Sequence, residues 1–203
     1  MSITINSQLA NGYFEENSFI ITDDATGESA IVDPCFYNFK SIILPEKIKY
    51  ILLTHGHIDH IAHVNAVVKK CGGLIVSHKD EKDILKSSEL NLTNKTKELL
   101  SIKPDVFLND GDILTLGESK ITLMHTPGHT TGSSCYIIDM HMFTGDTVIS
   151  GTVGRCDLPT GNFDIMKKSI DKIKKLKGDF VIYCGHGQNS TLDFERNYNP
   201  YFR

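Results

Sequence analysis

The chain reads Thr54-His55-Gly56-His57-Ile58-Asp59-His60 at the end of a nearly continuous apolar run, Ile48–Thr54. The run predicts a strand buried on both faces, and the apolar residues that recur after Asp59 predict a helix with Asp59 as its N-cap. In extended backbone, residues two positions apart point the same way, so the histidines on either side of Gly56 can share one side. The turn into the helix can bring the aspartate and the last histidine to the same space. Histidine is the commonest metal ligand, so four candidate ligands within six positions predict a metal site.

Three more candidate ligands lie in glycine-rich turns at predicted strand ends. His129 lies in Thr126-Pro127-Gly128-His129-Thr130-Thr131-Gly132-Ser133, and Asp146 in Thr144-Gly145-Asp146-Thr147. His186 lies in Cys184-Gly185-His186-Gly187. Flanking glycines allow tight backbone conformations that aim a side chain into a cleft, and strand ends are where a rigid scaffold meets functional loops. Together with the first cluster, these residues make seven nitrogen and oxygen ligands for metal.

The rest of the pattern predicts strands, a helix, more strands and another helix. Short β-branched and apolar segments between turn signals predict strands in the first third, and strands return between residues 106 and 147. Residues 164–177 predict the clearest helix, with an apolar stripe opposite a solvated lysine face. The polar stretch 80–103 predicts an irregular excursion that shapes the substrate pocket. This order favours an α/β (α+β) fold with two sheets packed face to face and helices outside.

Composition excludes several classes of protein. The 203 residues are 40% hydrophobic and 23% charged, as in an ordinary globular domain. A net charge of −4 gives no broad attraction to nucleic acid or to an anionic membrane. No apolar run approaches the ~20 residues that span a bilayer, and no signal peptide is visible. The five cysteines are scattered and odd in number, which predicts reduced thiols and a cytoplasmic protein.

These motifs, taken in order, resemble those of the metallo-β-lactamase superfamily. The resemblance spans about residues 3 to 200 and is nearest to the short glyoxalase II-like (hydroxyacylglutathione hydrolase-like) branch, which Gly154-Arg155-Cys156-Asp157-Leu158-Pro159 and the ending Glu195…Asn199-Pro200 support. It implies a four-layer αββα sandwich of two mixed sheets, with a binuclear metal site at one edge. It assigns to the first metal His55, His57 and His129, to the second metal Asp59, His60 and His186, and to both metals a bridging Asp146.

The resemblance also implies the chemistry. It points to a hydrolase of small-molecule thioesters in which a metal-bridging hydroxide attacks the carbonyl, with Asp59 as the catalytic residue that orients the hydroxide. Nitrogen and carboxylate ligands without thiolate favour zinc, with iron or manganese as alternatives. Arg155 is expected either to bind a substrate carboxylate or to pair with Asp157. Asp33 is expected either to orient a metal-bound histidine or to cap its strand.

Residues 1–203 are expected to form a single catalytic domain. The C-terminal helical domain that binds glutathione in full-length glyoxalase II has no counterpart in the sequence, so glutathione specificity stays open. The four other histidines match no ligand position of the family and are expected to be structural; they are His63, on a helix surface, and His78, His125 and His141.

Other activities of the same fold remain as alternatives. A persulfide dioxygenase would use a single iron ion, and the other alternative is a lactone or ester hydrolase of the same fold. A β-lactamase is disfavoured because the main two-zinc lactamases have cysteine where this chain has Asp146. An oxygen-reducing diiron protein typically has Glu at the position of His57, and a nuclease would want a basic surface. A non-catalytic scaffold predicts a broken ligand set, whereas all seven ligands are present.

Overall fold

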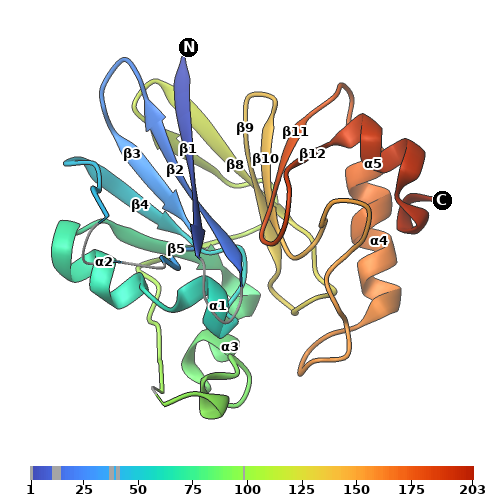
Figure 1. Cartoon of the computed structure of the whole chain (residues 1–203), viewed down its shortest axis with the longest axis horizontal. Coiled ribbons are helices and arrows are strands. Elements are labelled where there is room, and N and C mark those ends of the chain that lie inside the picture. The colour runs from blue at the N-terminus through green and yellow to red at the C-terminus, as the bar shows by residue number, and fades with distance from the viewer. Residues whose placement is uncertain (1, 11–14, 37–38, 40–41, 98) are drawn as a thin grey trace.

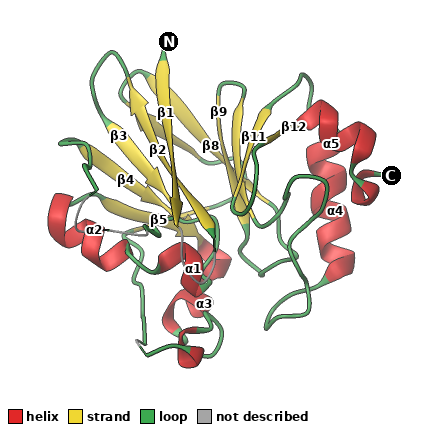
Figure 2. Cartoon of the chain, viewed as in Figure 1, coloured by secondary structure: helices red, strands yellow, loops and turns green. Residues whose placement is uncertain are grey.

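A computed structural model describes residues 2–10, 15–36, 39, 42–97 and 99–203. Two six-stranded sheets lie face to face with helices outside them (Figures 1 and 2). The first sheet has the strand order β1 (Ile3–Ala10), β2 (Glu16–Asp23), β3 (Ser29–Val32), β4 (Ile48–Leu52), β5 (Leu74–His78), β6 (Val106–Leu108). Its first three strands pair antiparallel and β3 to β6 pair parallel, so the sheet is mixed.

The second sheet is also mixed. Its order is β12 (Ser190–Thr191), β11 (Val181–Cys184), β10 (His141–Gly145), β9 (Ser134–Ile138), β8 (Ser119–His125), β7 (Ile113–Leu116). Strands β7 to β10 pair antiparallel, β10 and β11 pair parallel, and β11 and β12 pair antiparallel. The expectation of two mixed sheets is therefore confirmed.

The helices form the two outer layers. Beside the first sheet lie α1 (Ile58–Ile61), α2 (Val64–Cys71) and α3 (Lys82–Lys86), and beside the second lie α4 (Phe163–Lys174) and α5 (Leu192–Tyr198) (Figure 2). Three short 3-10 helices complete the chain: η1 (Lys79–Glu81), η2 (Thr93–Lys95) and η3 (Pro200–Phe202). The resulting order of layers is helix, sheet, sheet, helix, as the sequence predicts.

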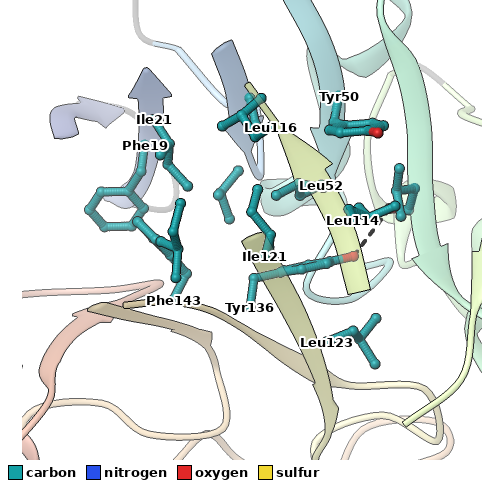
Figure 3. Packing of buried hydrophobic residues seen from close by; sticks show 14 of the residues in the cluster. Phe19, Ile21, Tyr50, Leu52, Leu114, Leu116, Ile121, Leu123, Tyr136 and Phe143 are labelled. Carbon is teal, nitrogen blue, oxygen red and sulfur yellow. Dashed lines mark hydrogen bonds between the residues drawn. The ribbon is translucent and has the colours of Figure 1, made fainter. Parts of the chain in front are cut away.

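The buried strands have no polar face because each lies between two apolar cores. In β4, Tyr50 and Leu52 face the core between the sheets, whereas Ile51 faces the core under α1 and α2. Successive strand residues point to opposite faces, so a strand covered on both faces reads as a continuous apolar run. Figure 3 shows the core between the sheets, where Phe19 and Phe143 lie 5.3 Å apart between ring centroids.

One helix prediction is wrong in its detail. The helix expected from Asp59 onward is broken into α1 and α2, and the N-cap of α1 is His57, without a side-chain cap hydrogen bond. Asp59 lies in the first turn of α1. The break places His63 half-buried rather than on a helix surface, where its Nδ1 accepts a hydrogen bond from the Phe36 amide at 3.2 Å. The loop after β3 therefore contacts the helical segment at the residue where it is interrupted.

The apolar stripe expected for the second predicted helix, which includes Ile165, is buried only in part. In α4 the buried side chains include Met166, Ile170 and Ile173, but Ile165 is exposed. Asn162 caps the helix by accepting a hydrogen bond from the amide of Ile165. Within the part of the chain that the structure describes, no helix is both long and apolar enough to cross a membrane. All five cysteines are free thiols, as the sequence predicts.

Candidate metal centre

Four loops converge at one edge of the sandwich, and each carries predicted ligands. The loop from β4 into α1 carries the first cluster, and the other three follow β8, β10 and β11 (Figure 1). Because the first loop belongs to one sheet and the other three to the second, the site lies between the sheets. All seven predicted ligands fall into groups whose ligand atoms lie within 4.8 Å of one another.

Three histidines form the first group. The Nε2 atom of His129 lies 2.8 Å from Nδ1 of His57 and 3.2 Å from Nε2 of His55. Ligands held tetrahedrally at about 2.0 Å from a zinc ion lie about 3.3 Å from one another. The two distances from His129 are therefore short enough for the three nitrogens to be ligands of one shared ion.

The second group contains a carboxylate and two imidazoles. One oxygen of Asp59 lies 3.3 Å from Nε2 of His186 and 4.0 Å from Nε2 of His60. Asp146 lies between the two groups. Its Oδ2 is 3.4 Å from His129 Nε2, and its Oδ1 is 3.4 Å from His60 Nε2 and 3.6 Å from His186 Nε2. A single carboxylate thus faces both groups, as a bridging ligand must.

Hydrogen bonds to residues outside the two ligand groups determine which ring nitrogen of His129 and of His60 is available to a metal. The carbonyl of Arg155 lies 2.7 Å from His129 Nδ1, and Asp33 Oδ2 lies 2.8 Å from His60 Nδ1. Each of these oxygens accepts a hydrogen bond from Nδ1–H, which leaves the Nε2 lone pair for a metal. Thr54 donates its hydroxyl to the same Asp33 oxygen at 2.5 Å and lies 3.2 Å from Nδ1 of His55. Asp33 therefore orients a candidate ligand, which was one of its two expected roles.

Two buried polar atoms without a hydrogen-bond partner indicate that these residues can hold a cation. The His60 Nε2 and Asp146 Oδ1 atoms are fully buried and have no hydrogen-bond partner. Leaving a buried polar atom unpaired costs about 1–3 kcal/mol. The two atoms face each other at 3.4 Å, beyond the usual length of a hydrogen bond, and a metal ion bound between them would satisfy both.

The charges in the site also suit a cation. Burial, together with neighbouring histidines, holds the pKa of His55 well below its usual value and lowers the pKa of His57 to about 3, so both rings are neutral at pH 7. Burial opposes ionisation of Asp59 and Asp146, but nearby His60 overcomes it and holds both pKa values below the usual value. Burial also opposes a charged His60, yet the carboxylates of Glu16 and Asp33 raise its pKa well above the usual value. A metal at His60 would therefore displace a proton.

A cavity of about 590 Å³ opens beside the ligands. One wall comes from the 80–103 segment through Leu92, Lys95 and Thr96, so this segment does line the pocket as expected. The opposite wall comes from the segment after β10, whose lining side chains are Ile149, Val153, Gly154, Arg155 and Leu158. The cavity is thus mostly apolar, with candidate metal ligands on its floor and two cationic side chains in its walls.

Arg155 lies in the pocket wall with its charge already paired. Its Nε and Nη2 atoms each donate to a carboxylate oxygen of Asp157 at 2.7 Å, and the side chain is 63% exposed. The ion pair is the second of the two roles that the sequence left open.

Two buried glutamates near the site were not found from the sequence. Glu81 is fully buried and accepts hydrogen bonds from both loops that carry the first group. Glu16 is also fully buried, 3.4 Å from His60 Nδ1. Each is a single glutamate in an otherwise ordinary segment, so no local signal in the sequence marks it.

A further group of possible ligands has the wrong geometry for a metal. His78, Asp80 and His125 bring ligand atoms within 4.8 Å, but the two imidazole rings stack at 3.7 Å with an angle of 11° between their planes. A metal binds in the plane of an imidazole ring, and one ion cannot lie in two parallel planes. The two histidines are structural, as the sequence predicts, and so is His141, whose ring lies 3.1 Å from the hydroxyl of Tyr183.

Comparison with known proteins agrees with this architecture. The family model described as the metallo-beta-lactamase superfamily matches residues 12–186. The chain is 33% identical to hydroxyacylglutathione hydrolase GloC of Haemophilus influenzae, covering 93% of each chain. It is also 33% identical to probable metallo-hydrolase YqgX of Bacillus subtilis, covering 74% of each. The crystal structure of BLEG-1 B3 metallo-beta-lactamase superposes with a TM-score of 0.84 at 28% identity, over 98% of this chain and 99% of that one. The chain therefore belongs to the metallo-beta-lactamase superfamily of metal-binding hydrolases.

Proposed function

We propose that this protein is a thioester hydrolase of the hydroxyacylglutathione hydrolase type. The observation that carries the proposal is the complete set of seven nitrogen and oxygen ligands beside a cavity of about 590 Å³. The relative GloC, named a hydroxyacylglutathione hydrolase, covers nearly the whole chain at 33% identity. Both observations support hydrolysis of a small acyl compound.

The proposed cofactor is a pair of divalent ions, with zinc as the first choice and iron or manganese as alternatives. The ligand atoms are imidazole nitrogens and carboxylate oxygens, and the described residues place no thiolate in the groups, which suits these metals. When bound, two such ions supply a hydroxide nucleophile at neutral pH and polarise the substrate carbonyl. On the same grounds we propose that one ion is held by His55, His57 and His129, the other by Asp59, His60 and His186, and both by Asp146.

The protein's own residues have distinct proposed roles. Asp59 lines the cavity and is held ionised by its histidine neighbours, so it can accept a hydrogen bond from the attacking water and orient it. Ile58, Leu92 and Val153 give the acyl chain an apolar surface. Arg155 remains a proposed substrate-binding residue, although Asp157 already holds two of its donors.

The test is release of thiol from S-lactoylglutathione by zinc-loaded protein, beside a control stripped with chelator. We expect fast release that depends on metal. A protein verified to hold two metals that cleaves neither this thioester nor a simple ester would contradict the proposal.

Two further measurements separate the alternatives within the family. One iron per chain with oxygen uptake on a persulfide would indicate a dioxygenase instead. Hydrolysis of a chromogenic cephalosporin in preference to any thioester would indicate a β-lactamase, the activity named for the structural relative BLEG-1.

We further propose a small-molecule substrate, no nucleic-acid or membrane partner, a cytoplasmic location, and a single catalytic domain over residues 1–203. The pocket lining supports the first of these, because its dimensions suit a small acyl compound.

A further inference from the structure

Glu81, the last residue of η1, joins two loops that are far apart in the sequence. Its side chain has no solvent exposure. One oxygen, Oε1, accepts a hydrogen bond from the amide of Gly56 at 2.7 Å. The other, Oε2, accepts one from the Thr130 hydroxyl at 2.8 Å and one from the Gly132 amide at 2.9 Å. Gly56 lies between two candidate ligands, and Thr130 directly follows a third.

We propose that Glu81 is a positioning residue for the first metal. It connects the His55–His57 loop to the His129 loop and so sets the distances among the three nitrogens. This inference rests on the metal centre proposed above, and it adds a residue that touches neither the metal nor the substrate.

The packing around the carboxylate supports a dedicated contact. A Cβ atom added at Gly132 would lie 2.5 Å from Glu81 Oε2, and one added at Gly56 would lie 3.1 Å from Oε1. Neither glycine is among the described residues with positive φ, so backbone conformation does not require glycine there. At Gly132 an added Cβ would meet the backbone of Glu81 as well as its carboxylate, and at Gly56 it would meet Ile84 and Leu85 as well as the carboxylate. Both glycines therefore allow the close approach of the segment that carries Glu81.

The contact is selective for the first group of ligands. The second group is held by other side chains: Asp33 binds His60, and Asn17 donates to the carbonyls of Cys184 and Gly187 on either side of His186. Among the described residues, the hydrogen bonds of Glu81 go to Gly56, Thr130 and Gly132, and none goes to the residues of the second group. Loss of Glu81 should therefore weaken the first metal site and spare the second.

Glu81→Gln tests this with almost no change in shape. Whichever way the amide is turned, its NH₂ group faces at least one backbone N–H, so at least one hydrogen bond is lost. Zinc affinity is measured at pH 8 by competition with a chelator, in two backgrounds. A His186→Ala background reports the first site, and a His57→Ala background reports the second. We expect a loss of about 10–100-fold at the first site, the usual effect of removing a partner behind a metal ligand, and less than about threefold at the second.

Glu195 offers a matched control. Like Glu81, it is fully buried. It accepts hydrogen bonds from the Gly151 amide, the Ser190 hydroxyl and the Asn199 side chain, none of which belongs to the His55–His57 loop or the His129 loop. Glu195→Gln should lower stability without changing zinc affinity at the first site. Equal weakening of the first site by both variants would show that general destabilisation is responsible and would overturn the proposal.

Two more variants test the role of Glu81 independently of Glu81→Gln. If Glu81→Gln does not fold, Thr130→Val removes one of the three donors to Glu81, together with the contact of the Thr130 hydroxyl with Ser133 Oγ. It should weaken the first site, by less than the roughly 10–100-fold expected for Glu81→Gln. Glu81→Asp keeps the charge but shortens the reach by one methylene, so it should also weaken the first site. Unchanged first-site affinity in a folded Glu81 or Thr130 variant would refute the positioning role. A parent protein that binds no zinc would refute the metal centre as well, whereas one that binds zinc but cleaves no thioester would refute only the activity.

Discussion

At the scale of single residues, Asp146 is the side chain on which the two ligand groups depend together. Its two oxygens face His129 on one side and both His60 and His186 on the other. Among the described residues, no other carboxylate approaches both ligand groups, so Asp146 is the candidate for a bridging ligand.

Asp146→Ala should therefore reduce both metal occupancy and turnover. Removing a partner that merely orients a ligand costs about 10–100-fold, so removing a shared ligand should cost at least about 100-fold in thioester hydrolysis. Metal analysis beside the kinetic assay checks this. Asp171→Ala, which removes an exposed carboxylate on α4, serves as the control and should change neither value. Full activity of Asp146→Ala would exclude the bridging role.

The second residue-scale prediction concerns the protonation of Glu81. Burial raises the pKa of its carboxyl to about 7, although hydrogen bonds from Thr130, Gly56 and Gly132 oppose the rise. The folded protein thus holds this proton more tightly than the unfolded chain, whose ordinary pKa is 4.5. The contribution of Glu81 to stability is then fully present below pH 4.5 and is lost as the pH rises to about 7.

The measurement compares metal-free wild type with Glu81→Gln, which cannot ionise. The free energy of unfolding of the wild type, relative to the variant, should fall by up to roughly 3 kcal/mol between pH 4.5 and pH 7.5. Other titrating groups are common to both proteins and cancel in the difference. A difference that rises with pH would mean that the carboxyl is held ionised instead.

At the scale of elements, the segment between β5 and β6, which the sequence predicts to be an irregular excursion, forms one wall of the cavity. It contains η1, α3 and η2, and through Leu92 and Lys95 it faces the segment that follows β10. The Lys95 ammonium forms no ion pair with a carboxylate among the described residues, whereas Arg155 is paired with Asp157. Lys95 is therefore the cation in this wall that remains free to meet an anionic part of the substrate.

Lys95→Glu should raise KM for an anionic thioester and leave kcat nearly unchanged. An exposed ion pair contributes up to about 1 kcal/mol, so we expect an increase of about fivefold, smaller at high salt. Lys97→Glu makes the same charge change two residues away, at an exposed position outside the cavity lining, and is the matched control. An equal effect of both variants would point to general surface charge, not to contact with the substrate.

At the scale of the whole molecule, the site connects the two sheets. The ligands from residues 55–60 follow β4 of the first sheet, whereas those at 129, 146 and 186 follow strands of the second. The apolar core between the sheets holds them together without metal, but a bound ion adds direct bonds across the same interface. Metal binding should therefore stabilise the fold as a whole.

Metal-loaded protein should unfold at a higher temperature than chelator-treated protein. With free zinc at 1,000 times its Kd, one site adds about 4 kcal/mol, which corresponds to a rise in Tm on the order of 10 °C for a chain of this size. Calorimetry of both forms checks this. His186→Ala, which removes only a ligand of the second group, should keep part of the rise. No change in Tm on loading would contradict a metal site that spans both sheets.

Much of the fold and the whole of the proposed ligand set could be predicted from the sequence. The continuous apolar run of β4 reflects burial on both faces, and the two-sheet, two-helix-layer order follows from the alternation of strands and helices. The split between α1 and α2 could not be predicted, because the residue at the break, His63, contacts the Phe36 amide 27 residues earlier, and such a contact leaves no local signal. Arg155 could not be assigned either, because two roles were compatible with its neighbours in the sequence.

What the sequence alone determined is the set of candidate ligands and the family, since each ligand has a local mark: two-residue spacing, a strand end or a flanking glycine. What only the tertiary structure decided is how those ligands are held. Asp33 behind His60, and Glu81 between Gly56 and Thr130, lie 25 to 49 residues from the groups they contact. Such contacts exist because separate loops end at one edge of the sandwich, and their donors and acceptors leave no pattern along the chain. The physical reason is burial: a carboxylate taken out of water must find its hydrogen bonds from whichever segments surround it.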